Sequence, residues 1–279
     1  MRHIWVILII ESLLCGTIHA GNLSREEFSL KTLFGKLYQA PSDSLRSLLN
    51  DSICQQLNVS LQNDSSFEYA FDSLPYLGKV YSTDRKLRIY SWNYISTDGD
   101  YRFFSYFQFA SHKLVYLAQD RSGYLPENDR TINAKNWYGA LYYTAIPVSY
   151  QNEVHYILLG WSHYSSDLNF KVMDVLSIKE NTLTFGLPLF IQNNQSSYRV
   201  TLPYSSGHTL ALQYDPKRNI LIFSHLNNNS TKENRIPDES FSGFQLTSDK
   251  LIYKDEVTFD HHEITTPRTK VEYGLERKK

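Results

Sequence analysis

The chain has 279 residues, of which 42% are hydrophobic, so it is long enough to bury a sizeable core in one domain, or in one domain with an appendage. Its 28 basic and 29 acidic side chains give a formal net charge of 28 − 29 = −1, which argues against nucleic acid or an anionic lipid surface as a partner. The 21 tyrosines and 15 phenylalanines favour strands over helices.

Residues 1–20 have the features of a secretory signal peptide. Arg2 supplies the positive start, residues 4–10 are an unbroken apolar run, and the segment ends on the small residue Ala20. Glu11 inside the apolar region is atypical of a signal peptide. The run is too short for a transmembrane segment, which needs ~20 apolar residues. We therefore expect cleavage near Ala20 and export to the periplasm or the cell surface.

Cleavage at this point would leave a single cysteine. A lipid anchor at Cys15 is the alternative to simple cleavage, although the residue before it, Leu14, is too bulky for such a site. Once Cys15 is removed, Cys54 has no partner, and the mature chain can form no internal disulfide. Its stability then has to come from core burial, and we expect Cys54 to be a small buried residue of a helix.

Residues 21–66 form the predicted N-terminal helical segment. Ser24 and Glu27 have the spacing of a capping box, which predicts a helix start. Two apolar stripes at helical spacing follow, separated at Pro41, and they comprise Leu30, Leu33, Phe34 and Leu37, then Leu45, Leu48, Leu49, Ile53 and Leu57. We expect both stripes to pack against the sheet that follows. A surface for a partner protein is the alternative.

The centre of the predicted β domain, which spans residues 67–264, is the segment 87–119. It has the pattern strand, turn, strand, turn, strand, and its first strand alternates aromatic with aliphatic side chains. Asp98-Gly99 predicts a tight hairpin, because glycine tolerates the positive φ of such a turn. The strand after it, 101–109, is apolar on both faces and should be covered on both sides.

Short apolar strands then recur every ~8–12 residues, which is typical of a mainly antiparallel β fold. The expected architecture is a meander that forms a sandwich or open barrel. A propeller-like arrangement is the alternative, because several hairpins share an apolar strand, a turn with Asp and Lys, and a second apolar strand. The polar loop 121–135 is long enough to be functional. Residues 265–279 form a charged tail.

Several segments of the β region resemble a family of exported β-rich proteins of unknown function from Bacteroidota. The resemblance rests on five pieces that occur in order, at residues 86–92, 137–143, 158–161, 222–226 and 237–244. It implies a location in a Gram-negative cell envelope. It implies no activity, ligand or catalytic residue.

Motifs for cofactors and metals are missing from the sequence. There is no phosphate-binding glycine loop, no paired-cysteine zinc spacing and no nucleophile elbow, so we expect no cofactor. The one dense cluster of metal-ligand types runs from Asp260 through His261 and His262 to Glu263. Adjacent residues of a strand point to opposite faces, so at most two of the four can converge, and we expect no metal site.

Three aromatic residues are the candidates for a ligand-binding platform. Trp137 and Tyr138 directly follow the long polar loop, and Trp161 lies in a later strand. Flat rings with a polar tip suit stacking on sugars and contact with peptides. Ordinary packing between sheets is the alternative for all three.

A catalytic alternative centres on Asp174. Strand alternation puts this acid on an apolar face, where desolvation raises the pKa of a carboxyl group, as a general acid requires. Glu153 could supply the second carboxylate of a glycosidase, with His155 on its face. In the other interpretation Asp174 accepts hydrogen bonds from a turn or pairs with a basic side chain such as Arg88. The leading hypothesis is a binding or structural module of the cell envelope, with a glycan or peptide ligand, and the alternative is a carboxylate-dependent hydrolase.

Overall fold

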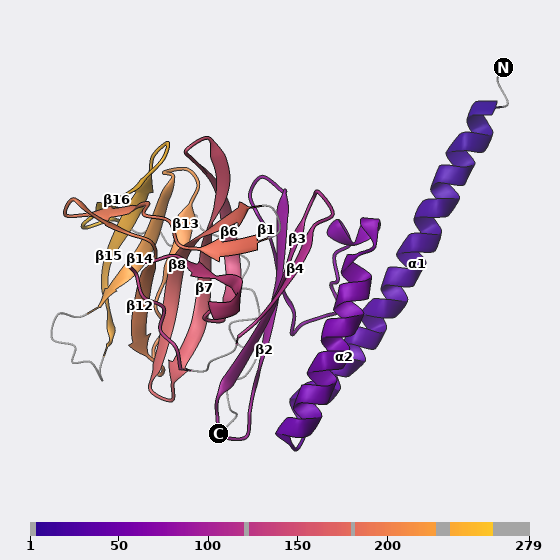
Figure 1. Ribbon diagram of the computed structural model, residues 1–279, viewed down its shortest axis with the longest axis horizontal. Coiled ribbons are helices and arrows are strands. Elements are labelled where there is room, and N and C mark those ends of the chain that lie inside the picture. The colour runs from indigo at the N-terminus through magenta and orange to yellow at the C-terminus, as the bar shows by residue number, and fades with distance from the viewer. Residues whose placement is uncertain (1–3, 120–122, 180–181, 227–234, 259–279) are drawn as a thin grey trace.

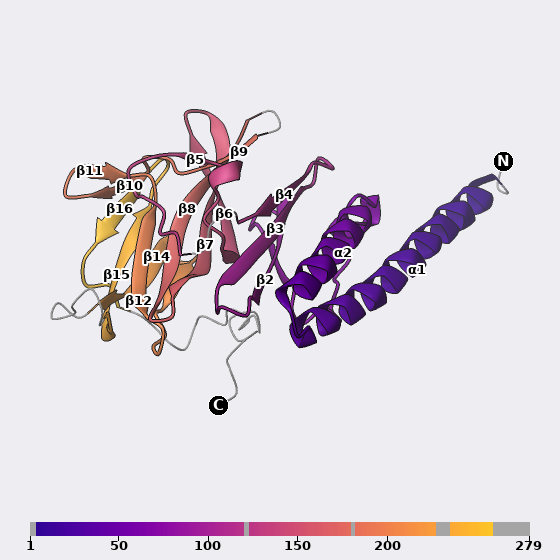
Figure 2. The same cartoon turned by 60° about the horizontal axis from the view of Figure 1, so that its bottom comes forward.

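The computed structural model describes residues 4–119, 123–179, 182–226 and 235–258, with side chains from Asn22 onwards. Two helices lie against three stacked β-sheets (Figure 1). The layers follow the order of the chain, from the helices through a four-stranded sheet to two larger sheets (Figure 2). The prediction of a mainly antiparallel β fold with an N-terminal helical pair is confirmed. The described strands form no closed barrel, and their sheets pack in a sandwich-like manner.

The helical layer consists of α1 (Ile4–Gln39) and α2 (Asp43–Leu61), followed by the short 3-10 helix η1 (Asp64–Phe67). Ser42 caps α2, because its side chain accepts a hydrogen bond from the main-chain N–H of Leu45 at 3.4 Å. The capping box predicted at Ser24 is wrong. The helix runs through this position from Ile4, so no unpaired helix-start amides are present there for Ser24 and Glu27 to satisfy.

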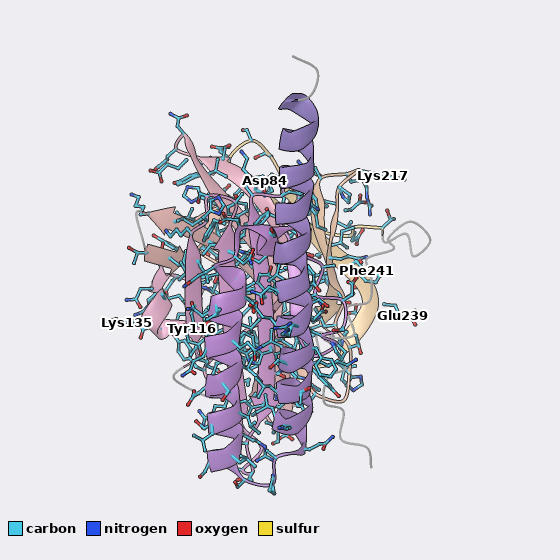
Figure 3. All side chains as sticks on the ribbon, turned by 90° about the vertical axis from the view of Figure 1, so that its right-hand side faces the viewer. Asp84, Tyr116, Lys135, Lys217, Glu239 and Phe241 are labelled. Atoms are coloured by element: carbon cyan, nitrogen blue, oxygen red, sulfur yellow. The ribbon has the colours of Figure 1, made fainter. Side chains whose placement is uncertain are left out.

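The helical pair docks on the first sheet, as its apolar stripes predict. Leu30, Phe34, Ile53 and Leu57 are buried in one cluster with aromatic side chains of the sheet, which include Tyr90, Trp92, Tyr94, Phe104 and Tyr106. The second stripe is only partly buried, because Leu45 and Leu48 lie on the outer surface of α2. In Figure 3 the two helices run side by side in front of the sheets.

The first sheet has the order β1 (Gly78–Tyr81), β2 (Leu87–Ile95), β3 (Tyr101–Phe109) and β4 (Leu114–Ala118). The predicted double cover of β3 is confirmed. Phe104 and Tyr106 face the helices, and Phe103 and Phe107 face the second sheet. Gly99 has a φ of +93° in the β2–β3 turn, which is the conformation that the Asp-Gly pair predicts.

The second sheet follows the order β5-β9-β8-β7-β6, and β12 pairs with the first half of β8, Leu168 to Met173. Its strands are β5 (Ile132–Asn133), β6 (Leu141–Tyr150), β7 (Glu153–Ser165), β8 (Leu168–Lys179), β9 (Thr182–Phe185) and β12 (Val200–Ser205). The 3-10 helix η2 (Ala134–Asn136) follows β5. Hairpins join β6, β7, β8 and β9, as the turn signals predict.

The third sheet follows the order β11-β10-β16-β15-β14-β13. Its strands are β10 (Phe190–Gln192), β11 (Gln195–Ser197), β13 (Leu212–Asp215), β14 (Ile220–Leu226), β15 (Pro237–Leu246) and β16 (Leu251–Lys254). One pairing departs from the antiparallel pattern, because β10 and β16 run parallel. A second apolar core separates the first two sheets, and a third separates the second sheet from the last, so each sheet packs face to face on the next.

Candidate functional site

Asp174 lies on β8 and is fully buried, as its apolar surroundings predict. Its Oδ2 accepts hydrogen bonds from Nε of Arg199 at 2.9 Å and from the hydroxyl of Tyr138 at 3.0 Å. Its Oδ1 accepts from the main-chain N–H of Val175 at 2.7 Å. Asp174 thus pairs with a basic side chain, as one interpretation of the sequence expects, but the partner is Arg199 and not Arg88. Arg88 lies in the other core, on the helix-facing side of β2, where its guanidinium donates to main-chain carbonyls.

Burial and a neighbouring positive charge act in opposite directions on this carboxyl group, and burial has the larger effect. Burial raises the pKa of Asp174 above its ordinary value, and the Arg199 guanidinium opposes that shift. Burial also lowers the pKa of Arg199, but Asp174 outweighs it and raises the pKa of the guanidinium. The two groups form a buried ion pair with no solvent-exposed side-chain surface.

Arg199 uses its remaining donors on the long polar loop and on the end of β9. Its Nη1 donates to the carbonyl of Glu127 and, at 2.9 Å, to that of Arg130, and its Nη2 donates to the carbonyl of Phe185 at 2.8 Å. Gly186 lies so close that a Cβ there would come within 2.6 Å of Nη2. Arg199 therefore connects the described part of the loop to the second sheet by hydrogen bonds. Within the ion pair, the carboxyl group of Asp174 is enclosed and cannot reach a substrate as a general acid.

Glu153 and His155 do not join Asp174. Cross-strand pairing puts Leu158 opposite Asp174, so odd-numbered positions of β7 near it face the other side of the sheet. Glu153 is also five residues from that register position, roughly 17 Å along the strand. His155 is buried on the opposite face, where its Nδ1 lies 2.9 Å from the Ser177 hydroxyl. The acid pair that a glycosidase would need is not assembled from these residues.

Two of the three predicted platform residues lie inside the protein. Trp137 and Tyr138 are 2% and 0% exposed. The Trp137 indole donates to the Tyr142 hydroxyl at 2.9 Å, which donates in turn to that of Tyr138 at 3.3 Å. This chain of hydrogen bonds ends on Asp174. Packing between sheets, the alternative raised for these two rings, is what the structure has, so neither offers a face for stacking on an external ligand.

Trp161 is different, because it is only partly buried at one end of the second sheet. Its ring lies 5.8 Å from that of Tyr101 at an angle of 70°, and 5.9 Å from that of Phe103. His163 stacks on Tyr101 with ring centres 4.1 Å apart. We call Trp161, Tyr101 and His163 the aromatic edge. It joins β3 to β7, so rings from two sheets meet where both remain partly accessible to solvent.

The ring of His163 is fixed and has a shifted pKa. Its Nδ1 donates to Oδ1 of Asn169 at 3.0 Å, which orients the imidazole over Tyr101. Burial lowers the pKa of His163, so the ring favours its neutral form. A neutral ring suits stacking and hydrogen bonding with an uncharged ligand such as a sugar.

A polar cluster in the third sheet was missed by the sequence analysis. It contains His225, Ser242, Tyr253 and Asp255. Ser242 lies 2.8 Å from the Tyr253 hydroxyl, and Nε2 of His225 contacts Ser242 and lies 3.6 Å from Asp255. In a nucleophilic triad the acid holds the imidazole nitrogen that the serine does not use, whereas here both meet Nε2. Ser242 is also fully buried. The cluster therefore satisfies buried polar groups at the end of the core.

The comparisons with known proteins give no neighbour. No protein-family model, curated protein or solved structure matches the chain. In the described part of the chain, no helix has both the length and the apolar character to span a membrane. Those residues also contain no group of three or more metal-ligand side chains, and the Asp260–Glu263 cluster lies outside them, as does the charged tail 265–279.

Proposed function

We propose that this protein is an exported binding module of the cell envelope that recognises a glycan at the aromatic edge and catalyses no reaction on it. The observation that carries the proposal is the partial exposure of Trp161 beside Tyr101 and His163. Indole and phenol rings offer flat apolar faces together with polar tips, which is the combination that sugar rings require. The N-terminal signal features support export.

The positions of Asp174 and Glu153 support binding over hydrolysis. A glycosidase needs two carboxylates that both reach the scissile bond. Asp174 is enclosed and fully hydrogen-bonded, and Glu153 lies on the other face of the sheet. A peptide is the second ligand class for an aromatic site of this kind, and the same variants test it.

The direct test is a binding screen of the purified mature chain against bacterial-surface and dietary polysaccharides, followed by titration calorimetry. Trp161→Ala should weaken binding at least ten-fold, whereas Trp161→Phe should keep most of it, because a flat ring remains. Tyr116→Ala is the matched control, since Tyr116 is an exposed aromatic residue of β4, a strand that contributes no residue to the aromatic edge. Equal binding by Trp161→Ala and the parent would contradict the proposal.

Export is tested separately by expressing the full chain and measuring the mass of the product in each cell fraction. The proposal expects a chain that begins after Ala20 in the envelope fraction. Full-length protein in the cytoplasm would contradict export without touching the ligand site.

A further inference from the structure

We propose that the free edge of β4 binds an extended segment of a partner polypeptide, which joins the first sheet as a fifth strand. β4 is the last strand of the order β1-β2-β3-β4 and pairs with β3 alone. The opposite edge of this sheet is connected to the second sheet through a bridge between Ser82 and Ala145. Of the two edges, β4 is therefore the one left for an additional strand.

The register identifies which main-chain groups point outwards. Gln119 donates to the carbonyl of Phe103, and Phe109 donates to that of Lys113, so the odd-numbered residues of this strand bond to β3. The even-numbered residues turn their N–H and C=O groups to the open edge. No described residue hydrogen-bonds to the main chain of these three, Leu114, Tyr116 and Ala118.

The edge lacks the features that normally prevent strand addition. Soluble proteins protect such edges with lysine, proline or a β-bulge. The strand Leu114–Ala118 contains no charged residue and no proline, Lys113 lies just outside it at one end, and the pairing of the strand with β3 is continuous. Tyr116 is 40% exposed on it. An apolar edge strand without charge, proline or a bulge is a site for β-augmentation.

The spacing of the outward N–H and C=O groups at this edge suits a polypeptide ligand. The three even-numbered residues each present one N–H and one C=O group to the edge, about 6.6 Å apart. An extended polypeptide presents complementary groups at the same interval. A glycan carries hydroxyl groups and lacks the alternating N–H donors and C=O acceptors of an extended polypeptide. The inference therefore concerns a second site with a second class of ligand, independent of the aromatic edge.

Neighbouring elements favour a single strand over a second copy of this chain. On one side, the Tyr116 hydroxyl contacts Sγ of Cys54 in α2 at 3.3 Å. On the other, η2 carries the exposed Lys135, which Figure 3 shows farther out on the same flank as Tyr116. Two copies joined edge to edge would bring two such lysines together, whereas a single extended segment would not.

The experiment selects peptides from a phage-displayed library of random dodecapeptides against the folded chain. The selected peptide is then titrated into the parent, Tyr116→Pro and Tyr116→Ala. Proline removes one outward N–H but none of the bonds to β3, so the sheet should persist. Alanine removes the ring and keeps the N–H. We expect binding at least ten-fold weaker for the proline variant than for the alanine variant, and unchanged binding for Trp161→Ala.

Amide exchange measured by NMR on the parent protein decides the matter even if Tyr116→Pro fails to fold. The peptide should slow exchange at the three outward amides of Leu114, Tyr116 and Ala118. A selection that yields no binder, or protection confined to other strands, would overturn the site. If these three amides also exchange slowly when the protein self-associates without peptide, the partner is a second copy of this chain and the proposed peptide is wrong.

Discussion

At the scale of single residues, two buried arginines, Arg88 and Arg199, donate hydrogen bonds to main-chain carbonyl groups inside the protein. Arg88 has no carboxylate partner among its hydrogen bonds and donates to the carbonyls of Ser66, Phe67 and Tyr69, at 3.1, 2.8 and 2.6 Å. Arg199 divides its donors among one carboxylate, the polar loop and the Phe185 carbonyl of β9. A planar guanidinium can satisfy several acceptors at once, which explains its use at both positions.

The buried ion pair makes a strong prediction for Asp174→Asn. The variant keeps the shape of the side chain but leaves the Arg199 charge without a counter-ion in a desolvated site. We expect a loss of ~3–5 kcal/mol in the free energy of unfolding, measured by urea denaturation. Asp249→Asn, at an exposed turn, is the control and should change stability by less than ~0.5 kcal/mol. A fully stable Asp174→Asn variant would show that the pair is dispensable.

A second residue-scale prediction concerns Gly186. Its φ of +100° is unfavourable for any other residue, and a Cβ would lie 2.6 Å from Arg199 Nη2 and 3.0 Å from the Arg130 carbonyl. Gly186→Ala should therefore lower the melting temperature clearly, by at least ~5 °C. Gly207→Ala has open space around it and serves as the matched control. Equal melting temperatures for the two variants would contradict the close packing described for Arg199.

Glu27 gives stability a pH dependence. Burial alone would raise its pKa, but hydrogen bonds from the Tyr69 hydroxyl and the Ser73 amide outweigh that effect and lower it. A carboxyl group with a lowered folded-state pKa stabilises the protein above its unfolded pKa and loses this contribution as the pH falls through the folded value. Glu27→Gln should thus be less stable than the parent at pH 7, by ~1–3 kcal/mol. The difference should shrink below about pH 4. A gap that is constant from pH 7 to pH 3 would refute the linkage.

At the scale of elements, the helical pair is part of the core. Phe34 of α1 is buried against Trp92 of β2, with ring centres 6.2 Å apart at 88°. Phe28 of the same helix is 72% exposed. We expect Phe34→Ala to cost ~3–5 kcal/mol of unfolding free energy and Phe28→Ala less than ~0.5 kcal/mol. Similar values for both variants, measured by denaturant titration, would mean that α1 is an independent arm.

The sequence predicted correctly those elements that are marked by the periodicity of their own residues. The alternation in β2 put Trp92 toward the helices and Ile89 toward the second sheet, because strand periodicity is a property of neighbouring residues. The capping box at Ser24 failed, since a helix already runs through it. The short strands β10 and β11 were missed. They carry three residues each and depend on pairing, partly with distant β16.

At the scale of the whole molecule, long-range pairing limited what the sequence could reveal. The burial of Asp174 was predicted, but its partner was not, because Arg199 reaches it from 25 residues further along the chain. The same limit applies to the proposed binding site. Trp161 was identified as a candidate from its residue type, whereas its neighbours in the aromatic edge became evident only when the first and second sheets were brought together.

The central claim is that this fold binds a glycan at the aromatic edge and does not cleave it. The most direct measurement incubates the mature chain with a glycan selected in the binding screen and follows the heat of binding and the release of reducing ends in the same sample. We predict saturable binding that is lost in Trp161→Ala, with no new reducing ends. Reducing ends that appear with the parent and disappear with a folded Asp174→Asn variant would contradict the account and establish a hydrolase.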